Sequence, residues 1–430
     1  MILEVFLQFS ELFSHLHHAL RQSSHKFLLV ENQSIDDDRV ANSYLSFFYI
    51  NNLHLFRWRN AVADQAVTIR PIKAGEKKAL KQIMNNAFPF FMRLFFSFSK
   101  HTLVAEKNGE IVGGVILKMF MLQENVKAGL VSLIFCSPQH AGLGIGQSLS
   151  AAGLKTLEQH GCTQLFACVE GNNTSSSKLF SNSGFSRLSL FEQLKTYKLN
   201  NLRIWLNSFH FFDVGFFMWA KSTDNLPAYT ANSSTSRSEW LFTLFSHVFI
   251  LTVSLWRQGE ADFLALKNIL TLVATFAVFY GIRYGAMLSI AWYQKQQVEF
   301  KMWESGLMLS GLIALLFGGF MAAPGSLYPV EKNWTYKDHI PQLGKMALIS
   351  SVCLTSLIWC IGLLLNHNFI AEHWLHSLET AFLVGTGLLV LDVTLPFFPF
   401  SSFNGRRLWD WNKLAWGILT LSIIPLVVLF

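Results

Sequence analysis

Six apolar stretches in the second half of the chain limit its fold more than any other feature. They lie at 239–256, 264–293, 303–323, 344–366, 377–398 and 412–430. Each is long enough to cross a bilayer as a helix. The 430 residues are 51% hydrophobic and 14% charged, which is too apolar for an ordinary soluble enzyme. Charged residues are ordinary up to about residue 200 and sparse after 238. We therefore expect a soluble head followed by an all-α polytopic membrane domain, 239–430, of about six transmembrane helices.

Charge and cysteine usage exclude two further classes. The net charge is +7, but the basic residues are scattered and form no Lys/Arg run. We therefore expect no nucleic-acid partner, and we expect the basic residues to contact a lipid bilayer. The five cysteines include no C-x-x-C pair, which favours reduced thiols. Residues 1–65 form an N-terminal segment to which the sequence assigns no role.

A glycine-rich turn in the first half carries the clearest chemical signal. An apolar strand, Leu130 to Phe135, leads into this turn, and a helix is predicted from Gln147 to His160. Exposed backbone amides at a helix N-terminus bind phosphate anions. Gly142, Gly144 and Gly146 allow the backbone to approach such an anion closely. A packing turn without a ligand is the alternative, because such turns occur in many α/β proteins.

The surrounding segments alternate strands and helices. Val67 to Ile72 predicts a strand, and Ala74 to Phe88 a helix. Thr102 to Leu117 predicts a hairpin, because Asn108-Gly109 is a preferred two-residue turn. A further strand, 163–169, is followed by Asn173, a short helix and Gly184-Phe185.

The glycine-rich region and the later segment from Asn173 to Phe185, in this order, resemble the GNAT superfamily of N-acetyltransferases. Cys136-Ser-Pro138 matches its V-x-P segment, Ala141 to Gly146 its Q/R-x-x-G-x-G/A loop, and Asn173 to Phe185 its later N-to-GF pattern. The resemblance covers 66–200. It implies an α+β domain, a mixed central sheet with flanking helices, that takes acetyl-CoA as cosubstrate between two splayed strands. The residues that it assigns to this cosubstrate are Phe135, Cys136, Ala141, Gly142, Leu143, Gly144, Ile145, Gly146, Asn173 and Phe180.

The sequence departs from that family at two positions. Ala141 replaces the Gln or Arg of the loop, although a frame shifted by two residues would make Gln139 the polar residue. Phe180 stands where the family usually has a Tyr that can protonate the leaving thiolate. Acetyl transfer also needs a base for the acceptor amine. Glu170 is the first candidate and His140 the second; a solvated carboxylate and an ordinary turn histidine are the alternatives.

Between the two halves, 201–238 predicts an interfacial element and a linker. Residues 202–220 are rich in aromatic side chains with interspersed polar groups, which is typical of a membrane interface. Residues 224–238 are rich in Ser, Thr, Asn and Pro.

The second half resembles the site-2 protease family of intramembrane zinc metalloproteases over 264–415. The resemblance rests on Val298 to Trp303, Phe317 to Tyr328 with its Ala-Ala-Pro-Gly, and Asn404-Gly405. In that family an H-E-x-x-H and the Asp of a D-G motif bind zinc. Here the first motif falls on Arg283 to Met287 and the second on Asn404-Gly405, so the resemblance implies a pseudoprotease without metal. We expect Arg283 to pair with the other intramembrane charge, Asp392.

Two functions remain open at this point. The first is a membrane-tethered N-acetyltransferase that transfers the acetyl group of acetyl-CoA to an unidentified amine acceptor. That acceptor is a protein amine, a small polyamine or antibiotic, or a membrane-borne lipid headgroup. The alternative is a catalytically inactive regulatory protein whose pseudoprotease domain binds transmembrane segments.

Localisation is predicted as an integral protein of a bacterial inner membrane with a cytoplasmic head, because acetyl-CoA is cytosolic. Six spans would then place Lys332, Lys337, Arg406 and Arg407 outside, against the usual charge bias. A different span count, re-entrant segments and buried charges are the open explanations.

Overall fold

The structure of the chain is a computed structural model, which describes residues 67–88, 93, 97–223, 236–260, 264–331, 334–366, 371–397 and 399–428. The predicted N-terminal segment, 1–65, lies outside the described residues.

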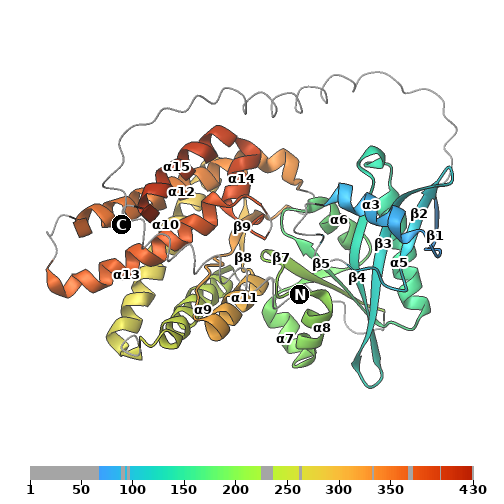
Figure 1. Ribbon diagram of the computed structural model, residues 1–430, viewed down its shortest axis with the longest axis horizontal. Coiled ribbons are helices and arrows are strands. Elements are labelled where there is room, and N and C mark those ends of the chain that lie inside the picture. The colour runs from blue at the N-terminus through green and yellow to red at the C-terminus, as the bar shows by residue number, and fades with distance from the viewer. Residues whose placement is uncertain are drawn as a thin grey trace, which may run out of the picture. The chain divides into compact units, whose positions relative to one another are not determined.

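A seven-stranded sheet forms the first half of the described chain (Figure 1). Its strand order is β1-β2-β3-β4-β5-β7-β6, and every neighbouring pair is antiparallel except β4 and β5. The mixed central sheet expected from the sequence is therefore confirmed. The strands are β1 (Thr68–Pro71), β2 (Leu103–Lys107), β3 (Glu110–Gln123), β4 (Val126–Cys136), β5 (Gln164–Glu170), β6 (Ser186–Leu188) and β7 (Phe216–Ser222).

The predicted hairpin turn between β2 and β3 is also confirmed. Asn108 has φ 56° and Gly109 φ 81°, the left-handed pair that a two-residue turn needs to match the twist of its strands.

Helices cover both faces of this sheet. They are α3 (Lys77–Ala87), the short 3₁₀ helix η1 (Pro138–His140), α5 (Ile145–Gln159), α6 (Thr174–Asn182), α7 (Leu190–Tyr197) and α8 (Asn200–Ser208). Side chains alternate along a strand. Val115 and Leu117 of β3 accordingly lie against Gly153 of α5, whereas Ile116 belongs to the cluster that contains Leu80 of α3.

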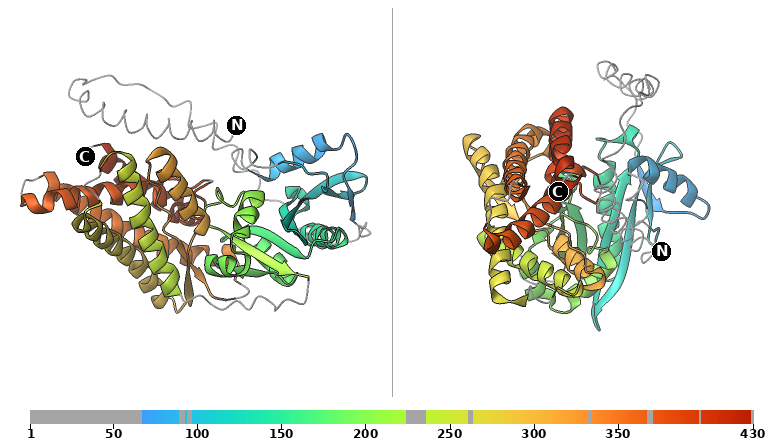
Figure 2. Two further views of the ribbon diagram at one scale, coloured as in Figure 1. Left: turned by 90° about the horizontal axis from the view of Figure 1, so that it is seen from below. Right: turned by 60° about the vertical axis from the view of Figure 1, so that its left-hand side comes forward.

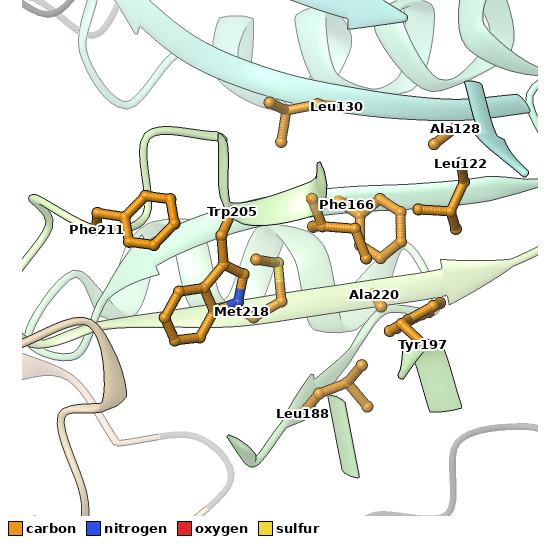
Figure 3. Close-up of a cluster of buried hydrophobic side chains, with 11 residues drawn as sticks. Leu122, Ala128, Leu130, Phe166, Leu188, Tyr197, Trp205, Phe211, Met218 and Ala220 are labelled. Atoms are coloured by element: carbon orange, nitrogen blue, oxygen red, sulfur yellow. The ribbon is translucent and has the colours of Figure 1, made fainter. Parts of the chain in front are cut away.

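The core on the α7–α8 side contains the aromatic residues of the segment predicted to be interfacial. Figure 3 shows Trp205 of α8 beside Met218 of β7, with Phe166 of β5 in the same cluster. The interfacial prediction for 202–220 is wrong over α8 and β7, because the sheet extends to Ser222. Aromatic residues are frequent both in strands and at membrane interfaces, so composition did not distinguish the two.

The second half of the described chain is mainly helical and carries a two-stranded sheet (Figure 1; Figure 2). Its elements are α9 (Ser236–Arg257), α10 (Leu266–Tyr293), β8 (Val298–Lys301), α11 (Glu304–Phe317), β9 (Ser326–Pro329), α12 (Tyr336–Asn366), α13 (Glu372–Leu389), the π-helical turn η3 (Val390–Thr394), α14 (Asn404–Trp411) and α15 (Lys413–Val428).

Four helical segments in the described residues are long and apolar enough to span a membrane, where six were expected. They are 236–257, 266–293, 336–366 and 374–394. The stretches predicted at 303–323 and 412–430 form the shorter helices α11 and α15. Helix α11 ends at Gly318, whose φ of 69° is left-handed, and the chain continues without a helix toward β9.

Candidate functional site

The parallel strands β4 and β5 separate toward their carboxyl ends. They pair from Ala128 with Gln164 as far as Val131 with Ala167, and no later residue of either strand pairs with the other. Each strand nevertheless keeps its other neighbour: β4 pairs with β3 up to Cys136, and β5 pairs with β7 up to Glu170. The result is a wedge whose two edges present unpaired backbone groups, which an extended ligand with amide groups can bind.

A bulge shapes the β4 edge of this wedge. Ile116 of β3 lies opposite Leu133, and Leu117 lies opposite Val131, so Ser132 is the extra residue between them. A bulge turns the local backbone and is frequent beside binding sites.

The glycine-rich turn follows directly from β4 at the mouth of the wedge. Gly142 and Gly144 have φ values of 81° and 75°, and a Cβ atom built on either would meet no atom within 4 Å. The first amide to return a helical hydrogen bond is Ser148 N, onto Gly144 O at 3.0 Å. The preceding amides at the N-terminus of α5 therefore have no helical acceptor, which leaves them available to an anion.

Asn173 and Phe180 lie on the helix after the wedge. Asn173 Oδ1 accepts a hydrogen bond from Ser176 N at 3.1 Å and caps α6. Phe180 is buried, with its ring 5.2 Å from that of Phe185. A phenyl ring has no proton to give, so the thiolate's proton has to come from another group.

Two carboxylates lie at the open end of the wedge. Glu170 is the last residue of β5, and Asp213 lies three residues before the start of β7. The two segments are adjacent, because Gly171 N donates a hydrogen bond to Gly215 O at 3.0 Å. Burial raises the pKa of Glu170, although a hydrogen bond from Ser401 and the nearby Arg406 lower it. Burial raises the pKa of Asp213 to about 7, with an opposing effect from His210.

Basic groups approach Asp213 from the sheet and from the loop before β7. Lys118 of β3 donates to Asn207 O at 3.0 Å, and burial lowers its pKa. His210 is fully buried, 3.6 Å from the Glu304 carboxylate. Burial alone would lower the pKa of His210, but Cys168 and Glu304 outweigh it and raise the pKa to about 10.

Sequence reasoning missed this group of residues because Asp213 and His210 lie in the segment interpreted as interfacial. The signal that could have found it was the short apolar and aromatic run at 216–220, which is consistent with a buried strand directly after Asp213. His140, the second predicted base, ends η1 just before the glycine-rich turn. Its Nδ1 is buried and has no hydrogen-bond partner within the described part of the chain.

The helical half of the chain covers the β5–β7 side of the wedge. Ser305 Oγ donates to Asp213 O at 2.7 Å, and Gln193 Nε2 donates to Glu304 Oε1 at 3.1 Å. A Cβ atom on Gly171 would lie 2.7 Å from Tyr328 of β9. Only glycine allows β9 to approach β5 this closely. The carboxylates of the site therefore face the helical half.

A second buried polar site lies within the helices. Arg283 Nε and Nη2 donate to the two oxygens of Asp392 at 3.0 and 2.9 Å, and Nη1 donates to Gly325 O at 3.0 Å. Asn404 Nδ2 donates to Asp392 Oδ2 at 2.8 Å. The predicted pairing of Arg283 with Asp392 is confirmed, and Asn404 is hydrogen-bonded to the same carboxylate.

These residues do not fit a zinc ion. The set contains one carboxylate, one amide and a guanidinium, and a guanidinium repels a cation and cannot lose its proton. The residues that the structure describes contain no group of three His, Cys, Asp or Glu side chains that could hold a metal. Gly405 is required here, because a Cβ atom on it would collide with Val393 O.

Comparison with known proteins supports the reading of the first half. Residues 75–185 match the Acetyltransferase (GNAT) family. Mycothiol acetyltransferase of Sanguibacter keddieii is 31% identical over 94 residues, which are 21% of this chain and 30% of that protein. The match to this family is thus confined to a segment of the head.

A different relative is a protein of Methanocaldococcus jannaschii that bears the name of a zinc metalloprotease. It is 28% identical over 134 residues, which are 29% of this chain and 62% of that protein. The chain thus spans less than two thirds of the length of both relatives.

Among solved structures, N-acetylglutamate synthase from Neisseria gonorrhoeae, complexed with coenzyme A and N-acetyl-glutamate, is similar over 38% of this chain and 36% of that one. The TM-score is 0.28 at 19% sequence identity.

Proposed function

We propose that this protein is a membrane-tethered N-acetyltransferase that uses acetyl-CoA. The observation that carries the proposal is the wedge between β4 and β5, with the glycine-rich turn at its mouth. In this proposal the wedge edges bind the pantetheine amides. The amides from Gly142 to Gly146 bind the pyrophosphate, with Phe135, Cys136, Ala141, Leu143 and Ile145 beside it.

The carboxylates at the open end supply the base. The acceptor nitrogen attacks the acetyl carbon, a C–N bond forms, and the C–S bond to coenzyme A breaks. Glu170 or Asp213 takes the amine proton, and the thiolate is protonated by water or by the acid so formed. Asp213, with a pKa of about 7, is well matched to such a base near neutral pH. His140 is the third candidate.

A topology with four transmembrane helices places the basic residues as the positive-inside rule expects, whereas a topology with six does not. With a cytoplasmic head, the two connections on the far side are 258–265 and 367–373, and the basic residues at their ends are Arg257 and Lys267 alone. Lys332, Lys337, Arg406 and Arg407 then fall on the cytoplasmic side, in accord with the positive-inside rule. This arrangement favours an integral membrane protein with the acetyltransferase domain in the cytoplasm, and we extend it to a bacterial inner membrane.

We also propose that the helical half is a pseudoprotease related to the site-2 proteases. The support is the meeting of Arg283, Asp392 and Asn404 at one point, where the resemblance places the catalytic metal. In this proposal it anchors the head and presents an acceptor amine at the membrane surface, since it covers one side of the wedge.

A second candidate is an inactive regulatory protein whose helical half binds transmembrane segments. The observation in its favour is Phe180, buried without a hydroxyl where the family has its acid.

The test is calorimetric titration of acetyl-CoA into the full-length protein in detergent. Gly146→Glu is the informative variant, because Gly146 has ordinary helical backbone and open space around its Cβ position. A glutamate in the first turn suits the helix but repels the pyrophosphate. We expect micromolar binding by the wild type, little change in Gly146→Ala, and a loss of roughly 100-fold or more in Gly146→Glu.

Release of free thiol on addition of amines, protein peptides or amine-bearing lipids then identifies the acceptor class. Binding without thiol release from any acceptor would favour the regulatory protein, and absence of binding by a folded wild type would refute the acetyltransferase.

A further inference from the structure

A polar cavity of about 300 Å³ lies where the head meets the helical half. One wall is the N-terminus of α6, with Asn172, Ser175 and Lys178, and the other is the start of α12, with Tyr336 and Lys337. The cavity shares no residue with the glycine-rich turn, but Asn173, which the resemblance assigns to acetyl-CoA, lies in its lining. Its volume is at the lower end of the range for small-molecule sites.

A buried side chain in the wall has hydrogen-bonding groups that a ligand in the cavity can use. Asn172 is only 8% exposed, and neither its Nδ2 nor its Oδ1 has a hydrogen-bond partner in the part of the chain that the structure describes. A buried amide without partners is destabilising, and such groups are rare in native proteins. A ligand that enters the cavity can restore these hydrogen bonds.

The electrostatics of the cavity select an anion. Two helix N-termini meet there, and Tyr336 N of one donates to Thr174 Oγ1 of the other at 3.1 Å. Ser175 N donates to no backbone acceptor within the described residues, and both ends carry the positive pole of a helix. Lys178 and Lys337 line the same cavity, and neither has an ion-pair partner among the described residues.

The neighbouring acids are already engaged. Asp338 is hydrogen-bonded to Thr335, and Asp410 accepts from Tyr336 Oη at 3.1 Å and from Arg406 Nε at 2.7 Å. Among the residues that the structure describes, no carboxylate lines the cavity itself. Lysines combined with free amides at helix N-termini are the donor set that binds phosphate.

We propose that this cavity binds the phosphate group of an organic phosphate, held between Lys178 and Lys337 with Asn172 as a further hydrogen-bonding partner. Two sources have this chemistry. One is coenzyme A, in which case the inference rests on the proposed function. The other is the headgroup of an anionic phospholipid, because α12 is a candidate membrane span whose polar first turn borders the cavity. The second source does not depend on acetyl transfer.

The experiment uses the full chain and two probes. Coenzyme A is titrated by calorimetry, and retention of phosphatidylglycerol is measured by native mass spectrometry after exchange from mixed micelles. The variants are Lys178→Glu and Lys337→Glu. The matched control is Lys155→Glu, which makes the same charge change at an exposed position of α5. Lys337→Gln and Asn172→Asp are the milder variants if a reversal impairs folding, which thermal unfolding would reveal.

We expect each cavity variant to weaken one of the two probes by roughly tenfold or more, with the control unchanged. Weaker coenzyme A binding assigns the cosubstrate, and loss of phosphatidylglycerol assigns the lipid. If folded variants retain both probes at wild-type strength, the inference is overturned. If the wild type binds no coenzyme A, the proposed function is refuted but the cavity proposal is not. The phosphatidylglycerol measurement then tests whether the cavity binds a phosphate group.

Discussion

Asp392 and Asp213 differ in the hydrogen bonds that their carboxylates accept. Asp392 in the helical half accepts hydrogen bonds from Nε and Nη2 of Arg283 and from Nδ2 of Asn404, and it is fully buried. Asp213 in the head is partly buried, and its carboxylate accepts no hydrogen bond within the described residues, with Lys118 and His210 only nearby. The donors around Asp392 hold its carboxylate in place, whereas the carboxylate of Asp213 has no such donor among the described residues and is available to take a proton. We infer that the first aspartate is structural and the second chemical.

The largest expected effect is on the fixed pair. Arg283→Ala leaves the buried Asp392 without its counter-charge, and we expect a loss of about 3–5 kcal/mol in the free energy of unfolding. Thermal or denaturant unfolding in detergent measures it. Arg257→Ala, at an exposed position, is the control. An unchanged unfolding transition in Arg283→Ala would contradict a structural role.

The comparison predicts the reverse behaviour for Asp213. Asp213→Asn keeps the shape of the side chain but removes the base, and we expect kcat to fall by roughly 100-fold or more. Stability should stay the same or rise, because no hydrogen bond to the carboxylate is lost. Glu170→Gln, measured in parallel, shows which of the two carboxylates takes the proton. If neither substitution lowers kcat, the base lies elsewhere, with His140 next.

The pH dependence sharpens the same contrast. Burial raises the pKa of Asp213 to about 7, so its basic form, and with it the rate, should increase as pH rises through 7. A carboxyl with a raised folded-state pKa favours the folded protein at low pH, and this contribution is lost as pH rises from its ordinary value of 3.8 to about 7. Asp213→Asn should remove both effects. A wild-type rate that is flat from pH 5 to pH 8 would exclude Asp213 as the base.

The smallest effect is expected at Asn404. Asn404→Ala removes one hydrogen bond to Asp392 at 2.8 Å but leaves the ion pair intact, so the loss should be about 1–3 kcal/mol. Measuring the free energies of unfolding of Asn404→Ala and Arg283→Ala in parallel tests whether the loss is smaller in Asn404→Ala. A loss as large as that of Arg283→Ala would mean that the three residues act as one unit.

Local patterns determined much of the fold and one of the sites. Gly142 and Gly144 precede a helix in sequence and in structure, because phosphate-binding turns are built from consecutive residues. Asn108-Gly109 determined a turn for the same local reason. The pairing of Arg283 with Asp392 followed from a different argument: two charges in apolar segments are strongly destabilising unless they meet.

What only the tertiary structure decided is how distant segments combine. Composition showed apolar stretches but not which of them are long helices, because α11 and α15 are as apolar as the spans and merely shorter. No pattern near Asp213 revealed that it lies beside Glu170, since β5 and β7 are separated by three helices in sequence and adjacent in the sheet. The cavity of Lys178 and Lys337 likewise joins two halves of the chain. Periodicity records the environment of each residue, whereas a site depends on contacts between residues far apart in the sequence.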